Sequence, residues 1–226
     1  AQCLVGSEMC IRDSMDLTGT YFTSAEIAGP GFLNFRLGDQ WYAGVMNAVE
    51  TEKDVYGTND SLKGQMIMVE FVSANPTGPM HMGNARGGAL GDCLAAVLDW
   101  SGYDVTREFY INDAGNQIQK FGKSLAVRYL QKYCGEEAYP LPAECYQGGD
   151  IKVLAGEFAE LNGDKYVASC KGMDEETLFE SEAFAALKDA LVAYALPKNI
   201  EGLQRDLGKY RIKYDVWFHE SDLHSS

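Results

Sequence analysis

Apolar and polar residues first alternate regularly between residues 25 and 37. There a Gly-Pro-Gly turn is followed by a short alternating run that predicts a strand ending at Leu37. A helix from Gln40 to about Val55 is expected next. The polar loop of residues 56–65 follows this α+β segment, so we place a domain boundary after residue 60.

A second pattern, typical of an α/β fold, begins at Met66. Residues Met66–Val72 are almost continuously apolar, which is typical of a strand buried on both faces of a parallel sheet, and Glu70 is their one charge. A helix is expected over residues 85–100 and a second strand over Tyr103–Ile111. The apolar residues of that helix fall on one face: Leu90, Leu94, Val97 and Leu98. This order predicts a βαβ unit with a right-handed crossover.

The remaining residues predict helices and one more strand. A helix is expected to begin near Asn116, and residues 150–207 carry mostly helical patterns. In the helix expected at residues 174–195, a core-facing stripe is indicated by Leu178, Phe184, Leu187 and Leu191. Residues 213–218 have the pattern of a strand. The predicted fold class is therefore α/β, an incomplete Rossmann-like parallel sheet preceded by the end of a small α+β domain.

Composition and charge restrict the classes of function. The 226 residues are 46% hydrophobic and 23% charged, an ordinary globular mixture. The formal net charge of −14 argues against a chain that grips nucleic acid over its whole surface, and DNA is not an expected partner. The six cysteines form no CxxC pair, so we predict reduced thiols and no metal site. No apolar run approaches the roughly 18 residues that span a bilayer, so we expect a cytoplasmic protein without membrane contact.

The loop Ser73–Asn84, between the first sheet strand and the next helix, carries the densest polar chemistry. Open α/β sheets bind ligands at this carboxyl end of their strands. The helix N-terminus contributes unpaired N–H groups and a partial positive charge, which favour an anion. His81 and Asn84 are expected to face that anion as hydrogen-bond donors, while Gly83 and Gly87 permit close approach. The loop is neither a Walker A loop nor a GxGxxG turn.

The segment Val69–Asp92, VEFVSANPTGPMHMGNARGGALGD, resembles the one that bears the HIGH signature in class I aminoacyl-tRNA synthetases, the arginyl family in particular. His81-Met82-Gly83-Asn84 occupies the four signature positions, with Asn84 where histidine is commoner. Residues 26–37 and 102–118 resemble the same family in the same order. The resemblance covers nearly everything after Ser14 and is loosest between residues 135 and 196.

The resemblance implies ATP-dependent attachment of L-arginine to its tRNA through arginyl-adenylate, with Mg²⁺ arriving with ATP. His81 and Asn84 match the positions that act on the phosphates during catalysis. The positions matching ATP-binding residues are Pro79, His81, Gly83, Asn84 and Gly87, and those matching arginine-binding residues are Glu70, Ser73, Asn75 and Asn112. The signature segment as a whole comprises Ala74, Asn75, Pro76, Thr77, Gly78, Pro79, Met80, His81, Met82, Gly83 and Asn84.

Several of these residues also have a purely structural interpretation. His81 could be a loop histidine paired with a backbone carbonyl. Glu70 could be a strand-end residue facing solvent, although a carboxylate there is well placed to receive a guanidinium. Asn112 and Asp113 form a polar turn at the end of the second strand, and a helix N-cap explains Asp113 almost as well as a binding role.

Both ends of the chain look cut. Residues 1–14 show no periodicity and resemble translated sequencing-adapter read-through, so we exclude them as a non-native leader; a natural surface strand is the alternative. Residues 15–60 are expected to be the C-terminal part of an N-terminal additional domain, and residues 61–226 the N-terminal part of the catalytic domain with a helical insertion. The 226 residues contain no Lys-Met-Ser-Lys run, the family's second phosphate-binding loop. We therefore expect a fragment that is inactive alone and whose tRNA contacts lie mainly in missing regions.

Two other functions are consistent with the same residues. One is a non-catalytic nucleotide-binding or regulatory module derived from a class I synthetase domain. The other is a different class I synthetase, such as the cysteinyl one. That enzyme would need metal-ligating cysteines around its amino-acid pocket, and Cys93 and Cys134 are poorly placed for this role.

Overall fold

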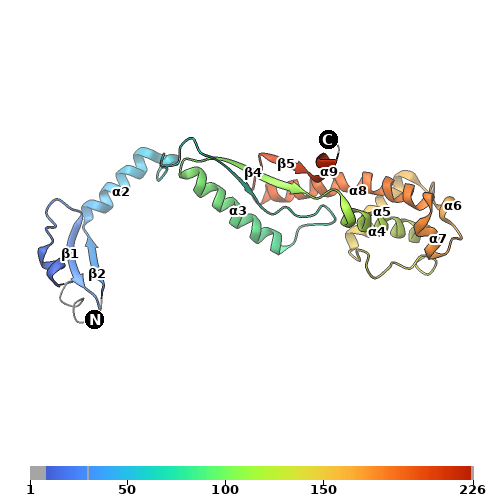
Figure 1. The fold of residues 1–226 in the computed structure, drawn as a ribbon, viewed down its shortest axis with the longest axis horizontal. Helices are drawn as coiled ribbons and strands as arrows, with labels where there is room; N and C mark the ends of the chain where they lie inside the picture. Colours follow the sequence, from blue (N-terminus) through green and yellow to red (C-terminus); the bar gives the residue numbers. More distant parts are fainter. Residues whose placement is uncertain (1–8, 30, 225–226) are drawn as a thin grey trace. The chain divides into compact units, whose positions relative to one another are not determined.

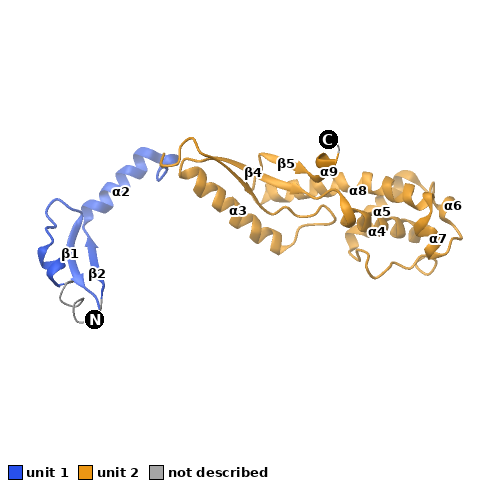
Figure 2. Cartoon of the chain, in the orientation of Figure 1, with its two compact units in different colours: residues 1–58 blue, residues 59–226 orange. Residues whose placement is uncertain are grey.

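The structure, a computed structural model, describes residues 9–29 and 31–224. Residues 1–8 of the predicted leader lie outside this part, and residues 9–14 are helical. The chain divides into two compact units, residues 1–58 and residues 59–226, which we describe separately (Figure 2).

The first unit contains a two-stranded antiparallel sheet followed by a helix. β1 (Phe22–Ile27) pairs with β2 (Leu33–Leu37), and α2 (Asp39–Glu52) leads into the short 3-10 helix η1 (Lys53–Val55). The predicted strand and helix are confirmed, whereas β1 was not predicted. Of the predicted Gly-Pro-Gly turn, Pro30 lies outside the described residues.

The second unit is built around a three-stranded parallel sheet in the order β3-β4-β5 (Figure 1). β3 (Met66–Glu70) leads through a loop into α3 (Met82–Trp100) and then β4 (Asp104–Ile111), which confirms the predicted βαβ unit. β5 (Val216–His219) pairs in parallel with β4 and precedes α9 (Glu220–His224). This mixed α/β architecture with a parallel sheet is the predicted fold class.

The prediction that the first sheet strand is buried on both faces was wrong. Met66 is 85% exposed and Met68 is 56% exposed, because the face of β3 that carries them is not covered by another element in the described part of the chain. The helix α3 likewise buries small residues and not its leucines. Gly88, Gly91 and Ala95 are the buried residues of α3. A side chain at Gly91 would collide with the ring of Phe71.

Consequently the apolar face expected for this helix is largely exposed. Leu90, Leu94 and Val97 are 73%, 51% and 63% exposed, respectively. Periodicity located the correct helix but selected the wrong inner face, because close packing on Phe71 requires glycine at the contact.

A helical segment between β4 and β5 has a core of its own. It comprises α4 (Gly115–Cys134), α5 (Gly149–Asn162), α6 (Val167–Cys170), α7 (Glu175–Glu180) and α8 (Glu182–Lys209). The predicted stripe is confirmed, since its four residues are 0–3% exposed: Leu178, Phe184, Leu187 and Leu191. The single helix expected at 174–195 is instead two helices. Ser181 separates them, and its Oγ accepts from Phe184 N at 3.1 Å as the N-cap of α8.

A second core joins the sheet to the end of α8. Phe109 and Ile111 of β4 are fully buried, and Leu203 and Leu207 of α8 pack in the same cluster. Phe109 stacks on Trp217 of β5 with ring centroids 4.6 Å apart. The C-terminal part of α8 therefore packs against the sheet.

Candidate functional site

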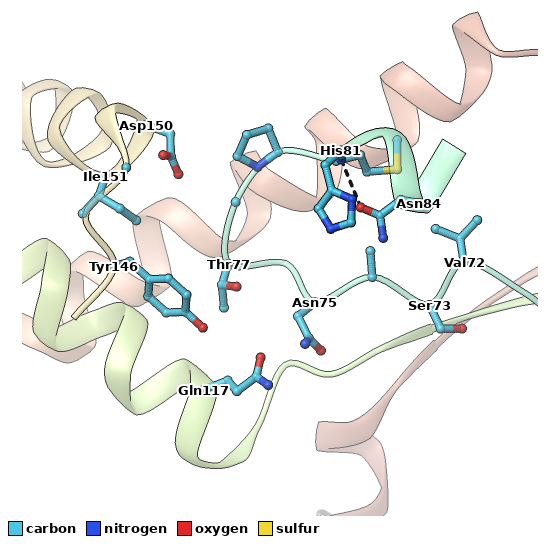
Figure 3. Close-up of a pocket in the computed structure, with 15 residues that line it drawn as sticks. Val72, Ser73, Asn75, Thr77, His81, Asn84, Gln117, Tyr146, Asp150 and Ile151 are labelled. Carbon is cyan, nitrogen blue, oxygen red and sulfur yellow. Dashed lines mark hydrogen bonds between the residues drawn. The ribbon is translucent and has the colours of Figure 1, made fainter. Parts of the chain in front are cut away.

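A cavity of about 570 Å³ lies beyond the carboxyl end of β3 (Figure 3). One side is the loop that connects β3 to α3, and the opposite side comes from the helical segment. The lining residues are Val72, Ser73, Ala74, Asn75, Thr77, Gly78, Pro79, Met80, His81, Asn84, Gln117, Tyr146, Gly148, Asp150 and Ile151. Its size is within the usual range of small-molecule sites.

His81 and Asn84 form a capping box at the start of α3. Nδ1 of His81 accepts a hydrogen bond from Gly83 N at 3.1 Å, and Oδ1 of Asn84 accepts one from His81 N at 3.0 Å. Because both acceptor atoms are engaged, a neutral His81 carries its proton on Nε2, and Asn84 retains both amide protons. Both side chains can therefore donate to an anion at the helix N-terminus.

The backbone turns sharply where β3 ends. Val72 and Ser73 have φ angles of 69° and 42°, a left-handed region that is unusual for these residues and costs on the order of 1–3 kcal/mol each. Ser73 Oγ donates to Glu70 Oε1 at 2.7 Å and accepts from Tyr110 N at 3.2 Å. This strained corner thus fastens the Glu70 carboxylate to β4.

Carboxylates gather at the carboxyl ends of the strands. Partial burial raises the pKa of Tyr110, and the carboxylates of Glu220, Asp113 and Glu70 raise it further. The negative charge at this edge of the sheet favours a cation with planar donors, such as a guanidinium.

The cavity brings together many of the predicted site residues but not all of them. Those that line it are Ser73, Ala74, Asn75, Thr77, Gly78, Pro79, Met80, His81 and Asn84. Those that do not are Glu70, Pro76, Met82, Gly83, Gly87 and Asn112. Glu70 is linked to the cavity through its hydrogen bond to Ser73. Pro76 is buried, and its carbonyl accepts from Asn199 Nδ2 of α8 at 2.9 Å.

Asn112 and Asp113 form hydrogen bonds with the residues where β5 meets α9. With its amide nitrogen as donor, Asn112 lies 2.7 Å from Glu220 Oε2. Asp113 accepts from Ser221 N and Ser221 Oγ, both at 2.9 Å, and pairs with His219 Nδ1 at 2.7 Å. Burial alone would raise the pKa of Asp113, but these hydrogen bonds outweigh it and lower that pKa. The N-cap interpretation of Asp113 was wrong, because Ala114 is the N-cap of α4.

Three polar residues on the cavity's far side were missed by the sequence analysis: Gln117, Tyr146 and Asp150. Gln117 follows the polar turn at Asn112 by five positions, so its position in the first turn of α4 was the available signal. Tyr146 and Asp150 fall where the family resemblance is loosest, and no local pattern distinguishes them from ordinary loop residues.

Neither a metal site nor a membrane helix is found in the described residues. Within residues 9–29 and 31–224, no group of three or more His, Cys, Asp or Glu side chains could hold a metal ion. In the same residues, no helix is both long enough and apolar enough to cross a membrane.

The fold and the loop together define a class of protein. A parallel Rossmann-like sheet, whose first strand leads through a His-Met-Gly-Asn loop into a helix N-terminus, is the catalytic-domain arrangement of class I aminoacyl-tRNA synthetases. Residues 45–189 match the family of class I (R) tRNA synthetase catalytic domains. The chain therefore belongs to the arginyl-tRNA synthetase family.

Relatives and solved structures agree with this assignment. An arginine–tRNA ligase of Acetivibrio thermocellus is 50% identical over 97% of this chain, which spans 36% of the relative's length. A crystal structure from Campylobacter jejuni, described as an arginyl-tRNA synthetase, is similar with a TM-score of 0.65 and 28% identity, covering 84% of this chain and 38% of that one. The Thermus thermophilus arginyl-tRNA synthetase shares the fold, with a TM-score of 0.54 and 21% identity over 96% of this chain and 32% of that one.

Proposed function

We propose that this chain supplies the ATP- and arginine-binding part of an enzyme that attaches L-arginine to its tRNA. In the first step the arginine carboxylate attacks the α-phosphate of ATP, which gives arginyl-adenylate and releases pyrophosphate. In the second step the arginyl group passes to the 3′-terminal adenosine of the tRNA. The protein's contribution is positioning and charge stabilisation, with Mg²⁺ carried in by ATP.

One observation carries the proposal: the capping box at the start of α3 leaves two donors beside the cavity. His81 Nε2 and Asn84 Nδ2 are suited to the phosphates of ATP, assisted by the N-terminus of the helix. Ser73 and Asn75 line the same cavity and are suited to the polar groups of arginine. Glu70, held by Ser73, is suited to a guanidinium.

Substitutions that preserve the cap test the phosphate assignment. Asn84→Asp retains an oxygen that accepts from His81 N, but it replaces the amide donor with a negative charge. We expect it to weaken Mg·ATP binding to the 226-residue chain by about tenfold or more in a calorimetric or NMR titration. Asn47→Asp places the same charge on an exposed position of α2 and is the matched control. Equal affinity for ATP in both variants would contradict the assignment.

We also propose that the 226 residues do not complete the reaction alone, because they lack a Lys-Met-Ser-Lys run. The measurement is arginine-dependent exchange between pyrophosphate and ATP, with and without the tRNA. We expect no exchange above background, and sustained exchange by the purified chain would refute this. The assignment of residues 15–60 to the end of a separate N-terminal domain stays a prediction.

A further inference from the structure

The cavity has a second wall that the proposed phosphate and arginine contacts leave unused. Gln117 comes from the first turn of α4, Tyr146 from the loop before α5, and Asp150 from the first turn of α5. In Figure 3 the Gln117 amide and the Tyr146 hydroxyl point into the space opposite Thr77 and Asn75. Neither of these two polar groups makes a hydrogen bond within the described part of the chain. Polar groups turned toward a cavity in this way are available to a ligand.

The Tyr146 residue is fixed by contacts with α4. Its backbone N donates to Ser124 Oγ at 2.9 Å, and Ser124 is fully buried while its hydroxyl also donates to Lys120 O at 2.7 Å. The ring packs edge-on against Phe121, with centroids 6.4 Å apart. Tyr146 also packs against the core of the helical segment, in which Ile151 is 1% exposed. The aromatic surface is therefore pre-positioned and its supports do not depend on a ligand.

The charged groups of this wall restrict where a phosphate can lie. Asp150 is the one carboxylate among the described lining residues, and it folds over Gly148, where any side chain would collide with it. Asp150 also lies against Gly78, since a Cβ built on Gly78 would be 3.4 Å from Asp150 Oδ2. A carboxylate at this edge repels phosphate but accepts hydrogen bonds from hydroxyl groups. Beside the Tyr146 ring the charge is positive, because Lys120 Nζ lies 5.5 Å from the ring centroid. It is therefore the Asp150 edge that disfavours the triphosphate, while the Tyr146 ring suits a polar ring system.

From these observations we infer that Gln117 and Tyr146 bind an adenosine, with the base against the Tyr146 ring and Asp150 near the ribose hydroxyls. This inference rests on the proposed function, which brings adenosine to the site in two forms, as ATP and as the 3′ end of tRNA. An aromatic face binds a base by stacking, and a side-chain amide can both donate to and accept from its edge. Asp150 sets the orientation, since it keeps the phosphates toward α3.

The test measures binding of adenosine, Mg·ATP and the trinucleotide CCA to the full 226-residue chain by NMR titration. Tyr146→Ala and Gln117→Ala should each weaken adenosine binding, the former by about tenfold or more. Tyr210→Phe and Gln204→Ala alter the same residue types at exposed positions outside the cavity and should change nothing. Tyr146→Phe keeps the ring, so it should retain most of the binding. Dispersed amide signals in the NMR spectrum of Tyr146→Ala show that its loss of binding is not unfolding.

The arms of the experiment separate the two sources of adenosine. Loss of affinity for ATP but not for CCA assigns the wall to the nucleotide, and loss for CCA but not for ATP assigns it to the tRNA end. No measurable adenosine binding, or equal affinity in all variants, overturns the inference. Asn84→Asp distinguishes this result from failure of the proposed function. That variant should weaken ATP binding and leave adenosine binding unchanged. An unchanged ATP affinity would contradict the phosphate assignment but not the adenosine inference.

Discussion

Removing the carboxylate of Asp113 should loosen the end of the sheet. This side chain is 9% exposed, and it accepts three hydrogen bonds from His219 and Ser221. Hydrogen bonds to a charged group contribute roughly 1.5–3 kcal/mol each and are not additive within one cluster. We therefore expect Asp113→Ala to lower the free energy of local opening at β5 and α9 by about 3 kcal/mol. Asp113→Asn keeps the bond from Ser221 N and should lower it by about 1–2 kcal/mol.

Hydrogen exchange followed by mass spectrometry on peptides covering residues 216–224 measures this effect directly. A loss of about 3 kcal/mol corresponds to exchange roughly a hundredfold faster in Asp113→Ala. Asp104→Asn, at the exposed start of the same strand, is the matched control and should leave these peptides unchanged.

The pH dependence of that difference has a defined sign. The folded-state pKa of Asp113 is lowered from its ordinary value of 3.8, so its contribution is complete above that value and is lost as pH falls through the folded pKa. The difference between the original chain and Asp113→Asn should therefore persist at neutral pH and vanish in strong acid. Equal protection of residues 216–224 in all variants at pH 7 would refute the reasoning.

Four other substitutions have expected outcomes. Gly91→Ala should destabilise the chain by about 1–3 kcal/mol in urea unfolding, because its Cβ would meet the Phe71 ring. Gly87→Ala, where the added Cβ has open space, should stabilise the chain by up to about 1 kcal/mol. Changes of the same sign in the two variants would contradict this reasoning. Burial raises the pKa of Tyr214, so its phenol should stay protonated at pH 10, the ordinary tyrosine midpoint. Tyr214→Phe should therefore leave the phenolate absorbance at pH 10 unchanged, and a measurable decrease would show that this ring is solvated. Ser73→Ala should cost about 1–2 kcal/mol, since it removes both hydrogen bonds of that hydroxyl, and an unchanged urea midpoint would exclude the role given to it.

Patterns that depend on neighbours in the chain were predictable from the sequence. The helix after residue 40, the βαβ unit and the stripe at Leu178 to Leu191 all follow from periodicity, and the structure has them. The loop at His81 was predictable because glycines, prolines and donors cluster between a strand and a helix. That local chemistry also placed His81 and Asn84 at a helix N-terminus, where the structure shows them.

Features set by distant contacts were not predictable in the same way. The inner face of α3 is chosen by Phe71, twenty positions before Gly91, and a hydrophobic pattern favours the leucines instead. The hydrogen bond between Asn112 and Glu220 joins residues more than a hundred positions apart. Tyr146 reaches the cavity only because α4 and α5 pack together, which no motif near Tyr146 indicates.

The hydrogen bond between Asn199 and Pro76 has a consequence for biosynthesis. Its two residues are 123 positions apart, so the loop cannot be tethered until α8 has left the ribosome. At about 5–20 residues per second, that interval is roughly 6–25 s. During this time the loop between β3 and α3 lacks the hydrogen bond from Asn199. Chaperone capture, or a translational pause before Asn199 is made, would therefore act on a cavity whose loop wall is not yet anchored.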